Sequence, residues 1–182
     1  MASKLKGKEW YQIMVPKLFG DFVIGETMAI DPQLIKGRVV EVSLTDISGD
    51  PTRYYFKFFF KVDEIKENKA LTKFVGHDCT RDYLARIVRT RTTRIDTNNT
   101  IDLLDGKMVV KTVGISNGPI SKNIARDLRR NISELVIKEL SKMKIEDFLN
   151  EMVEGKLQSR IRKVLSKIYP LRHFEFRKTK VI

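Results

Sequence analysis

The chain has 182 residues, and its 35 Lys and Arg against 23 Asp and Glu give a formal net charge of +12 at pH 7. A hydrophobic content of 42% is enough to bury a core, which excludes an intrinsically disordered protein. No apolar run reaches the ~18–20 residues of a membrane helix, and a single cysteine excludes an internal disulfide. We therefore expect a protein of a reducing, cytosolic setting whose excess positive charge is neutralised by nucleic acid.

The sequence opens with a basic arm, residues 1–10, and strand-like patterns predominate from residue 11 to residue 115. Alternation of hydrophobic and polar residues predicts two strands, over 38–46 and 52–62, joined by a turn at 48–51. The side chains expected to face inward are Val40, Val42 and Leu44 in the first strand and Tyr54, Phe56, Phe58, Phe60 and Val62 in the second.

Two further turns divide the later strands. Glu67-Asn68 leads into a strand over 70–75, and Asp105-Gly106 predicts a hairpin between 101–104 and 108–115. Strands this numerous, at short intervals, predict an antiparallel sheet that curls towards a barrel.

Helical periodicity occurs in two places. A short helix is predicted to begin after the N-cap Thr80, with Asp82 in its first turn and Leu84, Ile87 and Val88 on its buried face. Residues 121–168 are helix-rich: Ser121 caps a long helix and Gly155 is placed to end the next one.

Residues 171–182 are predicted to form an extended basic tail, in which Phe174 and Phe176 anchor the chain to the core. The expected fold class is thus α+β: an antiparallel curled sheet or β-barrel with an internal helix and a C-terminal helical segment. We expect a basic arm, 1–10, followed by a single α+β RNA-binding domain, 11–182.

Basic residues gather in three stretches with few acids: the arm, the short helix with the strand after it, and the tail. Arginine predominates in the second, where Thr90, Thr92 and Thr93 lie between the arginines. A guanidinium binds phosphate through two parallel hydrogen bonds and stacks on bases, so this stretch favours RNA. The third stretch begins on the helix before the tail with Arg160, Arg162, Lys163 and Lys167, and these are left open, because lysine and arginine are commonplace on helix surfaces. The residues expected to bind RNA are Lys4, Lys6, Lys8, Trp10, Lys17, Arg81, Arg86, Arg89, Arg91, Arg94, Arg172, Arg177, Lys178 and Lys180.

Residue combinations typical of enzymes are missing. The sequence has no Gly-x-Ser-x-Gly, no phosphate-binding glycine-rich loop and no His-Glu-x-x-His. Cys79 is expected to be a small buried apolar group. Asp96, Asp102 and Asp105 are the only candidates for a magnesium site, and their loose spacing is more typical of turn and edge residues. We expect no enzymatic activity, no cofactor, no metal and no small-molecule substrate.

Eight segments, in order and spacing, resemble the archaeal form of the small-subunit ribosomal protein family called S-one-e or S-three-A-e. The resemblance implies a β-barrel flanked by helices that is a structural constituent of the ribosome. It also implies a place on the platform near the messenger exit, with small-subunit rRNA and neighbouring ribosomal proteins as partners. The segments are GKEWY (7–11), PKLFG (16–20), IGET (24–27), GRVVEVSLTD (37–46), GHDCTRDYL (76–84), RTTRID (91–96), GKL (155–157) and YPLR (169–172).

The sequence departs from this family at residues 116–119, where members often carry several basic residues and this chain has SNGP. We therefore expect no RNA contact in that loop. Two other functions remain open from the residues alone: an RNA-binding translation factor that associates transiently with the ribosome, and a metal-dependent RNA-processing enzyme that uses the three aspartates.

Overall fold

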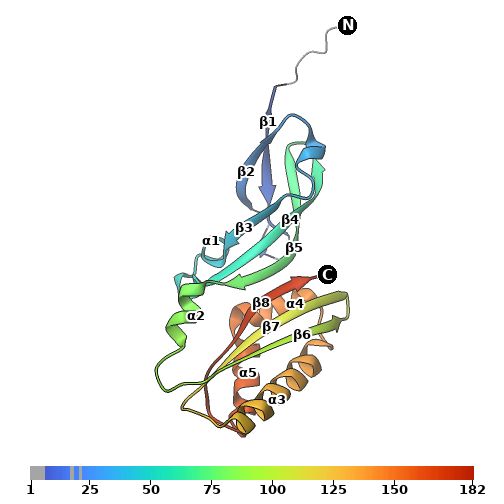
Figure 1. Ribbon diagram of the computed structural model, residues 1–182. Helices are drawn as coiled ribbons and strands as arrows, with labels where there is room; N and C mark the ends of the chain where they lie inside the picture. Colours follow the sequence, from blue (N-terminus) through green and yellow to red (C-terminus); the bar gives the residue numbers. More distant parts are fainter. Residues whose placement is uncertain (1–6, 17–18, 21) are drawn as a thin grey trace. The chain divides into compact units, whose positions relative to one another are not determined.

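The computed structural model describes residues 7–16, 19–20 and 22–182 (Figure 1). Of the predicted RNA-binding residues, Lys4, Lys6 and Lys17 lie outside the described residues. The chain divides into two compact units, residues 1–76 (unit 1) and 77–182 (unit 2), and the boundary falls inside one strand, β5. In the described part of the chain, no helix is long and apolar enough to span a membrane.

Unit 1 is built mainly from strands. Strand β1 pairs antiparallel with β2 and parallel with the start of β5, while β4 pairs with both β3 and β5. The predicted turn at Glu67-Asn68 joins β4 to β5, and Glu67 adopts a positive φ of 53° there. Its elements are β1 (Glu9–Met14), β2 (Val23–Ala29), η2 (Pro32–Leu34), β3 (Val39–Ser43), α1 (Leu44–Ser48), η3 (Pro51–Arg53), β4 (Phe56–Lys66) and β5 (Lys69–Cys79).

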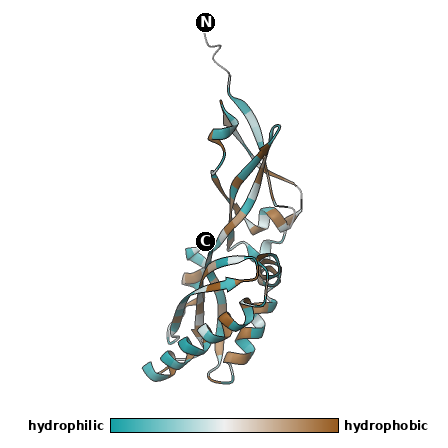
Figure 2. Ribbon diagram, turned by 90° about the vertical axis from the view of Figure 1, so that its right-hand side faces the viewer, coloured by the Kyte–Doolittle hydropathy of each residue, from teal (hydrophilic) through white to brown (hydrophobic). Residues whose placement is uncertain are grey.

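The alternation predicted for the second strand of the hairpin is confirmed for Phe56, Phe58, Phe60 and Val62, all of which are buried. Phe74 from β5 meets the rings of Phe58 and Phe60 at 5.8 and 6.3 Å between centroids, both edge-on. Edge-to-face packing adds to the hydrophobic gain of burying these rings. Figure 2 shows hydrophobic and hydrophilic residues alternating along the strands.

Two details of this hairpin differ from the prediction. Strand β3 ends at Ser43, whose side chain accepts a hydrogen bond from the Thr45 amide and caps α1, so Leu44 is buried as a helical residue. The prediction that Tyr54 faces inward was wrong. Tyr54 follows η3 and precedes β4, and without strand geometry its side chain is exposed.

Unit 2 is a sheet covered by helices. The end of β5 is followed in the sheet by β8, β7 and β6, and β7 is antiparallel to both β8 and β6. The predicted hairpin is the β6–β7 pair. Its turn is Leu104-Asp105 and not the predicted Asp105-Gly106, because Gly106 already pairs with Leu103. Its elements are α2 (Arg81–Ile87), β6 (Arg94–Leu103), β7 (Gly106–Ser116), α3 (Lys122–Leu140), α4 (Ile145–Glu154), α5 (Lys156–Leu165) and β8 (Leu171–Val181).

Helices lie on both faces of this sheet. Helix α3 packs on β6 and α5 packs on β8 (Figure 1). Ile132 of α3 packs over Gly114 of β7, since a Cβ added at the glycine would lie 3.4 Å from Ile132 Cδ1. Neighbouring side chains on β7 point to opposite faces, and Val113 and Ile115 accordingly contact α2 through Ile87.

The predicted helix starts and stops are largely confirmed. Ser121 accepts a hydrogen bond from the Ile124 amide at the start of α3, and Gly155 ends α4 in the left-handed conformation. Thr80 is the N-cap of α2 by position, although its side chain makes no capping bond. The prediction that Val88 belongs to the buried face of α2 was wrong, because the helix ends at Ile87 and Val88 is extended and exposed.

The segment predicted to be an extended tail is strand β8, paired with β7 from end to end. Phe174 and Phe176 are buried in unit 2, which confirms that they anchor the chain to the core. The register of β8 shifts twice, and the residues skipped in the pairing are Arg172 and Arg177. Each lies in a β-bulge, which changes the direction of the side chain relative to a regular strand.

The predicted α+β class is confirmed: a curled sheet with an internal helix and a C-terminal helical segment. The sheet is mixed rather than wholly antiparallel, because β1 and β5 run parallel. The described strands do not close into a barrel. They follow the order β2-β1-β5-β8-β7-β6, with β3 and β4 off this path.

His77, the first residue of unit 2, joins β5 to β8. Its Nε2 lies 2.8 Å from the Phe176 carbonyl oxygen, which can only accept, so Nε2–H donates and Nδ1 is left to accept from the Thr179 hydroxyl at 2.7 Å. The ring is fully buried, and desolvation lowers the pKa of His77 to about 4. Burial also raises the pKa of the neighbouring Cys79 thiol, as expected of an inert buried cysteine.

The free energy of unfolding should therefore fall in acid. Between pH 6.5 and about 4, His77 is protonated in the unfolded chain and stays neutral in the folded chain. The loss between pH 7.5 and pH 4.5 should approach about 2–3 kcal/mol, measured by urea unfolding followed at 222 nm. The variant His77→Gln should lose that part of the pH dependence, and an equally steep profile in the variant would refute this role.

Candidate nucleic-acid interface

Three loops of unit 2 are joined by hydrogen bonds at one end of its sheet, and we call this the loop end (residues 88–93, 116–121 and 166–172). Thr93 and Ser116 bond each other twice, with the Ser116 amide donating to the Thr93 carbonyl and the Thr93 amide donating to Ser116 Oγ. The Asn117 amide donates to the Pro170 carbonyl at 3.0 Å. The SNGP loop, from which RNA contact was not expected, therefore holds the other two loops together.

The first of these loops presents Arg89 and Arg91 from a tight turn. The Thr92 amide and hydroxyl both donate to the Arg89 carbonyl, and the hydroxyl oxygen accepts from the Arg89 amide. Arg91 has a φ of 62°, which is uncommon for a residue other than glycine, asparagine or aspartate. The turn keeps both arginine side chains exposed, and in the described residues neither forms an ion pair with a carboxylate.

Arginines from three segments converge on His173. Desolvation lowers the pKa of His173, and the positive charges of Arg172, Arg162 and Arg89 lower it further. Arg162 also donates from Nη1 to the Arg172 carbonyl at 3.3 Å. The structure thus brings together Arg89 and Arg172, from two separate stretches of the sequence, with Arg162, which sequence analysis left open.

Helix α3 begins at the loop end and adds further positive charge. Its first residues include the exposed Lys122 and Arg126, and its first turn contains no acid. Basic side chains near a helix N-terminus are opposed by the helix dipole, so this placement is unfavourable for the isolated helix. These two residues are not among those predicted from the sequence to bind RNA. The signal that was available is this absence of the usual first-turn acid.

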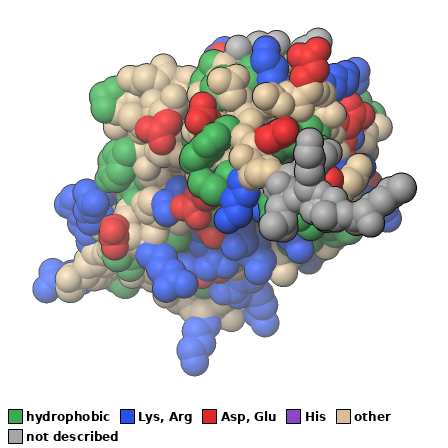
Figure 3. Space-filling model, turned by 90° about the horizontal axis from the view of Figure 1, so that it is seen from above, with side chains coloured by type: hydrophobic (Ala, Val, Ile, Leu, Met, Phe, Trp, Pro, Cys, Tyr) green, Lys and Arg blue, Asp and Glu red, His purple; other side chains and the backbone are tan. Residues whose placement is uncertain are grey.

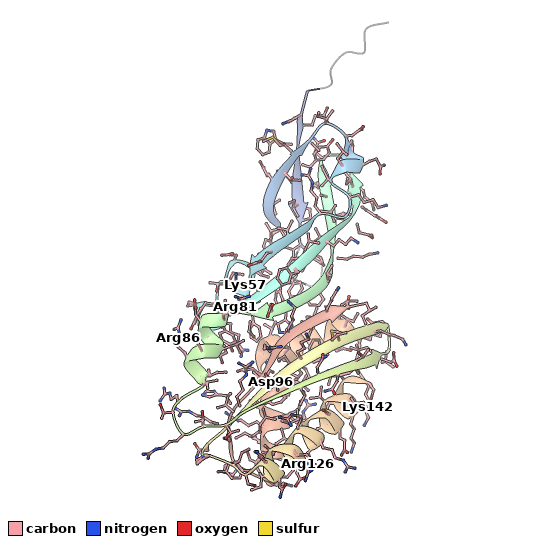
Figure 4. All side chains as sticks on the ribbon, in the orientation of Figure 1. Lys57, Arg81, Arg86, Asp96, Arg126 and Lys142 are labelled. Carbon is pink, nitrogen blue, oxygen red and sulfur yellow. The ribbon has the colours of Figure 1, made fainter. Side chains whose placement is uncertain are left out.

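The remaining predicted residues are distributed over other surfaces. Arg81 and Arg86 lie on α2 (Figure 4). Arg94 pairs with Asp96 at 2.9 Å and Lys178 pairs with Asp78 at 2.9 Å. Lys180 is exposed near the end of β8, while Lys8 and Trp10 belong to unit 1. On the face seen in Figure 3, Lys and Arg side chains crowd the lower part of the view.

Arg160, also left open, has a structural role. Its guanidinium bonds Glu139 at 3.0 Å and Glu151 at 3.1 Å, joining α3, α4 and α5. Because both carboxylates are less than one-third exposed, we assign Arg160 to the packing of the helices and not to the interface.

The three aspartates considered for a magnesium site do not converge. Asp96 and Asp102 lie six residues apart on β6, a separation of roughly 20 Å. Asp96 pairs with Arg94, Asp102 pairs with Lys107, and Asp105 accepts the Ile145 amide at the start of α4. Among the described residues, no group of three or more His, Cys, Asp or Glu side chains is arranged to hold a metal ion.

Comparison with known proteins identifies the relatives of this chain. The model of the Ribosomal S3Ae family matches residues 1–182. The chain is similar to proteins named "Small ribosomal subunit protein eS1" from Desulfurococcus amylolyticus and Staphylothermus marinus, each 34% identical over all of this chain and 86% of the relative. A protein of the same name from Saccharolobus islandicus is 35% identical over all of this chain and 88% of its own length.

The convergence of arginines on His173 can be tested without any ligand. In the double variant Arg89→Gln and Arg172→Gln the pKa of His173 should rise, because two positive charges that oppose protonation are removed. The measurement is an NMR titration of the imidazole resonances. Arg81→Gln, a change on α2 outside the three converging arginines, is the matched control and should leave the pKa unchanged. An unchanged pKa in the double variant would mean that these arginines do not surround His173.

Proposed function

The chain belongs to the ribosomal S3Ae family, and we propose that it is a structural constituent of the small ribosomal subunit. In this proposal it binds rRNA on the platform near the messenger exit and has no catalytic activity. Its partners are rRNA and neighbouring small-subunit proteins, and its location is the ribosome in the cytoplasm. The position on the platform is supported by the resemblance to the family alone.

The observation that carries the RNA-binding part is the loop end, where Arg89 and Arg172 act on the same histidine and Arg91 projects from the same turn as Arg89. Double-stranded RNA is recognised mainly through its shape, phosphates and 2′-hydroxyls, which suits a rigid set of basic side chains. Arginine adds bidentate binding of phosphate and stacking on exposed bases. The residues proposed to contact RNA are the lysines and arginines predicted from the sequence, with Lys122, Arg126 and Arg162 added.

The distribution of charge supports the same proposal. Residues 77–182 carry 23 Lys and Arg against 13 Asp and Glu, a net charge of +10. Such an excess destabilises a compact unit by self-repulsion unless a polyanion neutralises it. Binding to phosphates releases condensed counterions, so the affinity should be high and strongly dependent on salt.

Two other functions have less support from the structure. The metal-dependent RNA-processing enzyme would use Asp96, Asp102 and Asp105, which lie apart and bond Arg94, Lys107 and the Ile145 amide respectively. A translation factor that cycles on and off the ribosome would share the basic surface, and it differs in how it behaves on washed subunits.

Sedimentation distinguishes an integral constituent from a cycling factor. Native cell extract is separated on a sucrose gradient, before and after a high-salt wash, and fractions are probed for this protein. We expect stoichiometric migration with small subunits that survives the wash, because many phosphates are bound at once. Protein that stays at the top of the gradient, or leaves at modest salt, would favour the cycling factor instead.

The loop end can be tested by its salt dependence. The triple variant Arg89→Ala, Arg91→Ala and Arg172→Ala should bind small-subunit rRNA at least about tenfold more weakly. The slope of log affinity against log salt should become shallower by about two to three, because each phosphate that is no longer neutralised reduces it by close to one. Filter binding over a salt series measures both quantities.

The matched control removes the same charge from unit 1, at lysines that already pair with acids. These are Lys57 with Glu41, Lys66 with Glu64 and Lys73 with Asp63. The triple Ala variant at these lysines should keep the parent slope. Equal decreases in affinity in the two triple variants would show that only net charge matters and that the loop end is not the site.

A further inference from the structure

The two units differ sharply in charge. Residues 1–76 carry 12 Lys and Arg against 10 Asp and Glu, so unit 1 contributes only +2 of the net charge of +12. In the part of unit 1 that the structure describes, nine basic residues stand against nine acidic ones. A surface without excess positive charge gains little from counterion release, which is the main source of affinity for nucleic acid. The part of unit 1 that the structure describes is therefore poorly suited to bind RNA.

Unit 1 nevertheless exposes large apolar side chains on one face of its β1–β2 pair. Trp10 and Met28 lie directly opposite each other across the two strands, and they are 57% and 43% exposed. Ile30, just beyond the end of β2, is 47% exposed. Side chains directly opposite on an antiparallel pair are close neighbours. We call Trp10, Met28 and Ile30 the apolar patch.

The core of unit 1 does not require the side chains of the apolar patch. Side chains alternate along a strand, and the opposite face of the β1–β2 pair buries Tyr11, Ile13 and Ala29 in the core of unit 1. The next pair on the patch face, Gln12 opposite Glu26, is polar and exposed. The other face of the strand already fills the core, so packing within unit 1 does not explain the outward position of Trp10.

We propose that the apolar patch of unit 1 docks a neighbouring protein of the small subunit, whose surface offers an apolar pocket for the Trp10 indole within a rim of little net charge. The proposal rests on the proposed ribosomal function. Tryptophan and methionine are enriched at protein–protein interfaces, and a buried tryptophan commonly carries much of the binding energy. Charges of both signs lie next to the patch. Lys8 is two residues from Trp10 and the Arg38 guanidinium donates to the Thr27 hydroxyl and the Met28 carbonyl, while Glu26 is two residues from Met28 and Asp31 follows Ile30. Balanced charge matches a protein partner and offers no attraction to phosphate.

This assignment changes the role of one residue expected to bind RNA. Next to the lysines of the arm, Trp10 resembles a base-stacking residue. On its strand, however, its cross-strand neighbour is Met28, and the carboxylate of Glu26 lies diagonally opposite. A stacked base would bring its phosphates close to that carboxylate, whereas an apolar protein surface would not.

The test is photo-crosslinking from the full chain assembled into small subunits in cells. p-Benzoylphenylalanine replaces Trp10 in one protein, Met28 in a second and Arg89 in a third, and salt-washed subunits are irradiated. Trp10 and Met28 should give products of discrete higher mass that resist ribonuclease and disappear on protease treatment. Mass spectrometry should identify a peptide of another small-subunit protein, with apolar side chains at the attachment point. Arg89 should give a product that ribonuclease shortens.

Three results would overturn the proposal. A ribonuclease-sensitive product from Trp10 would mean that the patch contacts RNA, and a product of twice the chain mass would mean that it contacts a second copy. An absence of products from both Trp10 and Met28, while Arg89 crosslinks to RNA, would mean that the patch faces solvent. In each of these cases the ribosomal function stands. Failure of the protein to migrate with small subunits would overturn both.

A binding measurement gives an independent result. The double variant Trp10→Ala and Met28→Ala changes only exposed side chains, so the protein should stay folded and bind isolated small-subunit rRNA within about twofold of the parent. A decrease in affinity of tenfold or more, with an unchanged circular dichroism spectrum, would mean that the patch contacts RNA and not a protein.

Discussion

A buried neutral imidazole connects the two ends of unit 2. His77 and Thr179 are 102 residues apart in sequence, and their side chains lie 2.7 Å apart between β5 and β8. Closing so long a loop costs chain entropy, and bonds made inside the core, where water cannot replace them, help to offset that cost. Because β8 lies between β5 and β7, this contact attaches the end of β5 to the rest of the unit 2 sheet. The last residues of the chain are thus an integral part of the fold.

The unit 2 sheet and its loops hold positive charges that repel one another. Arg89, Arg162 and Arg172 act on the same imidazole of His173, and they come from a turn, a helix and a bulge. None of these segments could keep its arginine in place alone, since arginine side chains are long and carry much rotational entropy. The hydrogen bonds around Thr93 and Ser116 fix the backbones from which the arginines project. The loops that carry Arg89 and Arg172 are therefore held in place by the protein's own hydrogen bonds, without a bound phosphate.

Sequence analysis predicted what depends on local chemistry. The alternation in residues 56–62, the cap at Ser121 and the glycine at 155 each follow from neighbours within a few positions. It could not predict the bulges at Arg172 and Arg177, because a bulge exists only relative to the partner strand β7. The mistaken burial of Val88 arose at an element boundary, where a shift of one residue changes the direction of the side chain.

The candidate site follows the same division. Density of arginine identified residues 81–94, whereas the joining of Arg89 with Arg172 and Arg162 required the tertiary structure. Trp10 illustrates the opposite effect. Its sequence neighbours are the lysines of the arm, but in the sheet its neighbour is Met28, and the exposed face they share lies on a unit with almost no net charge. The chemistry that a side chain can perform is set by the residues opposite it, and for Trp10 these are apolar or acidic.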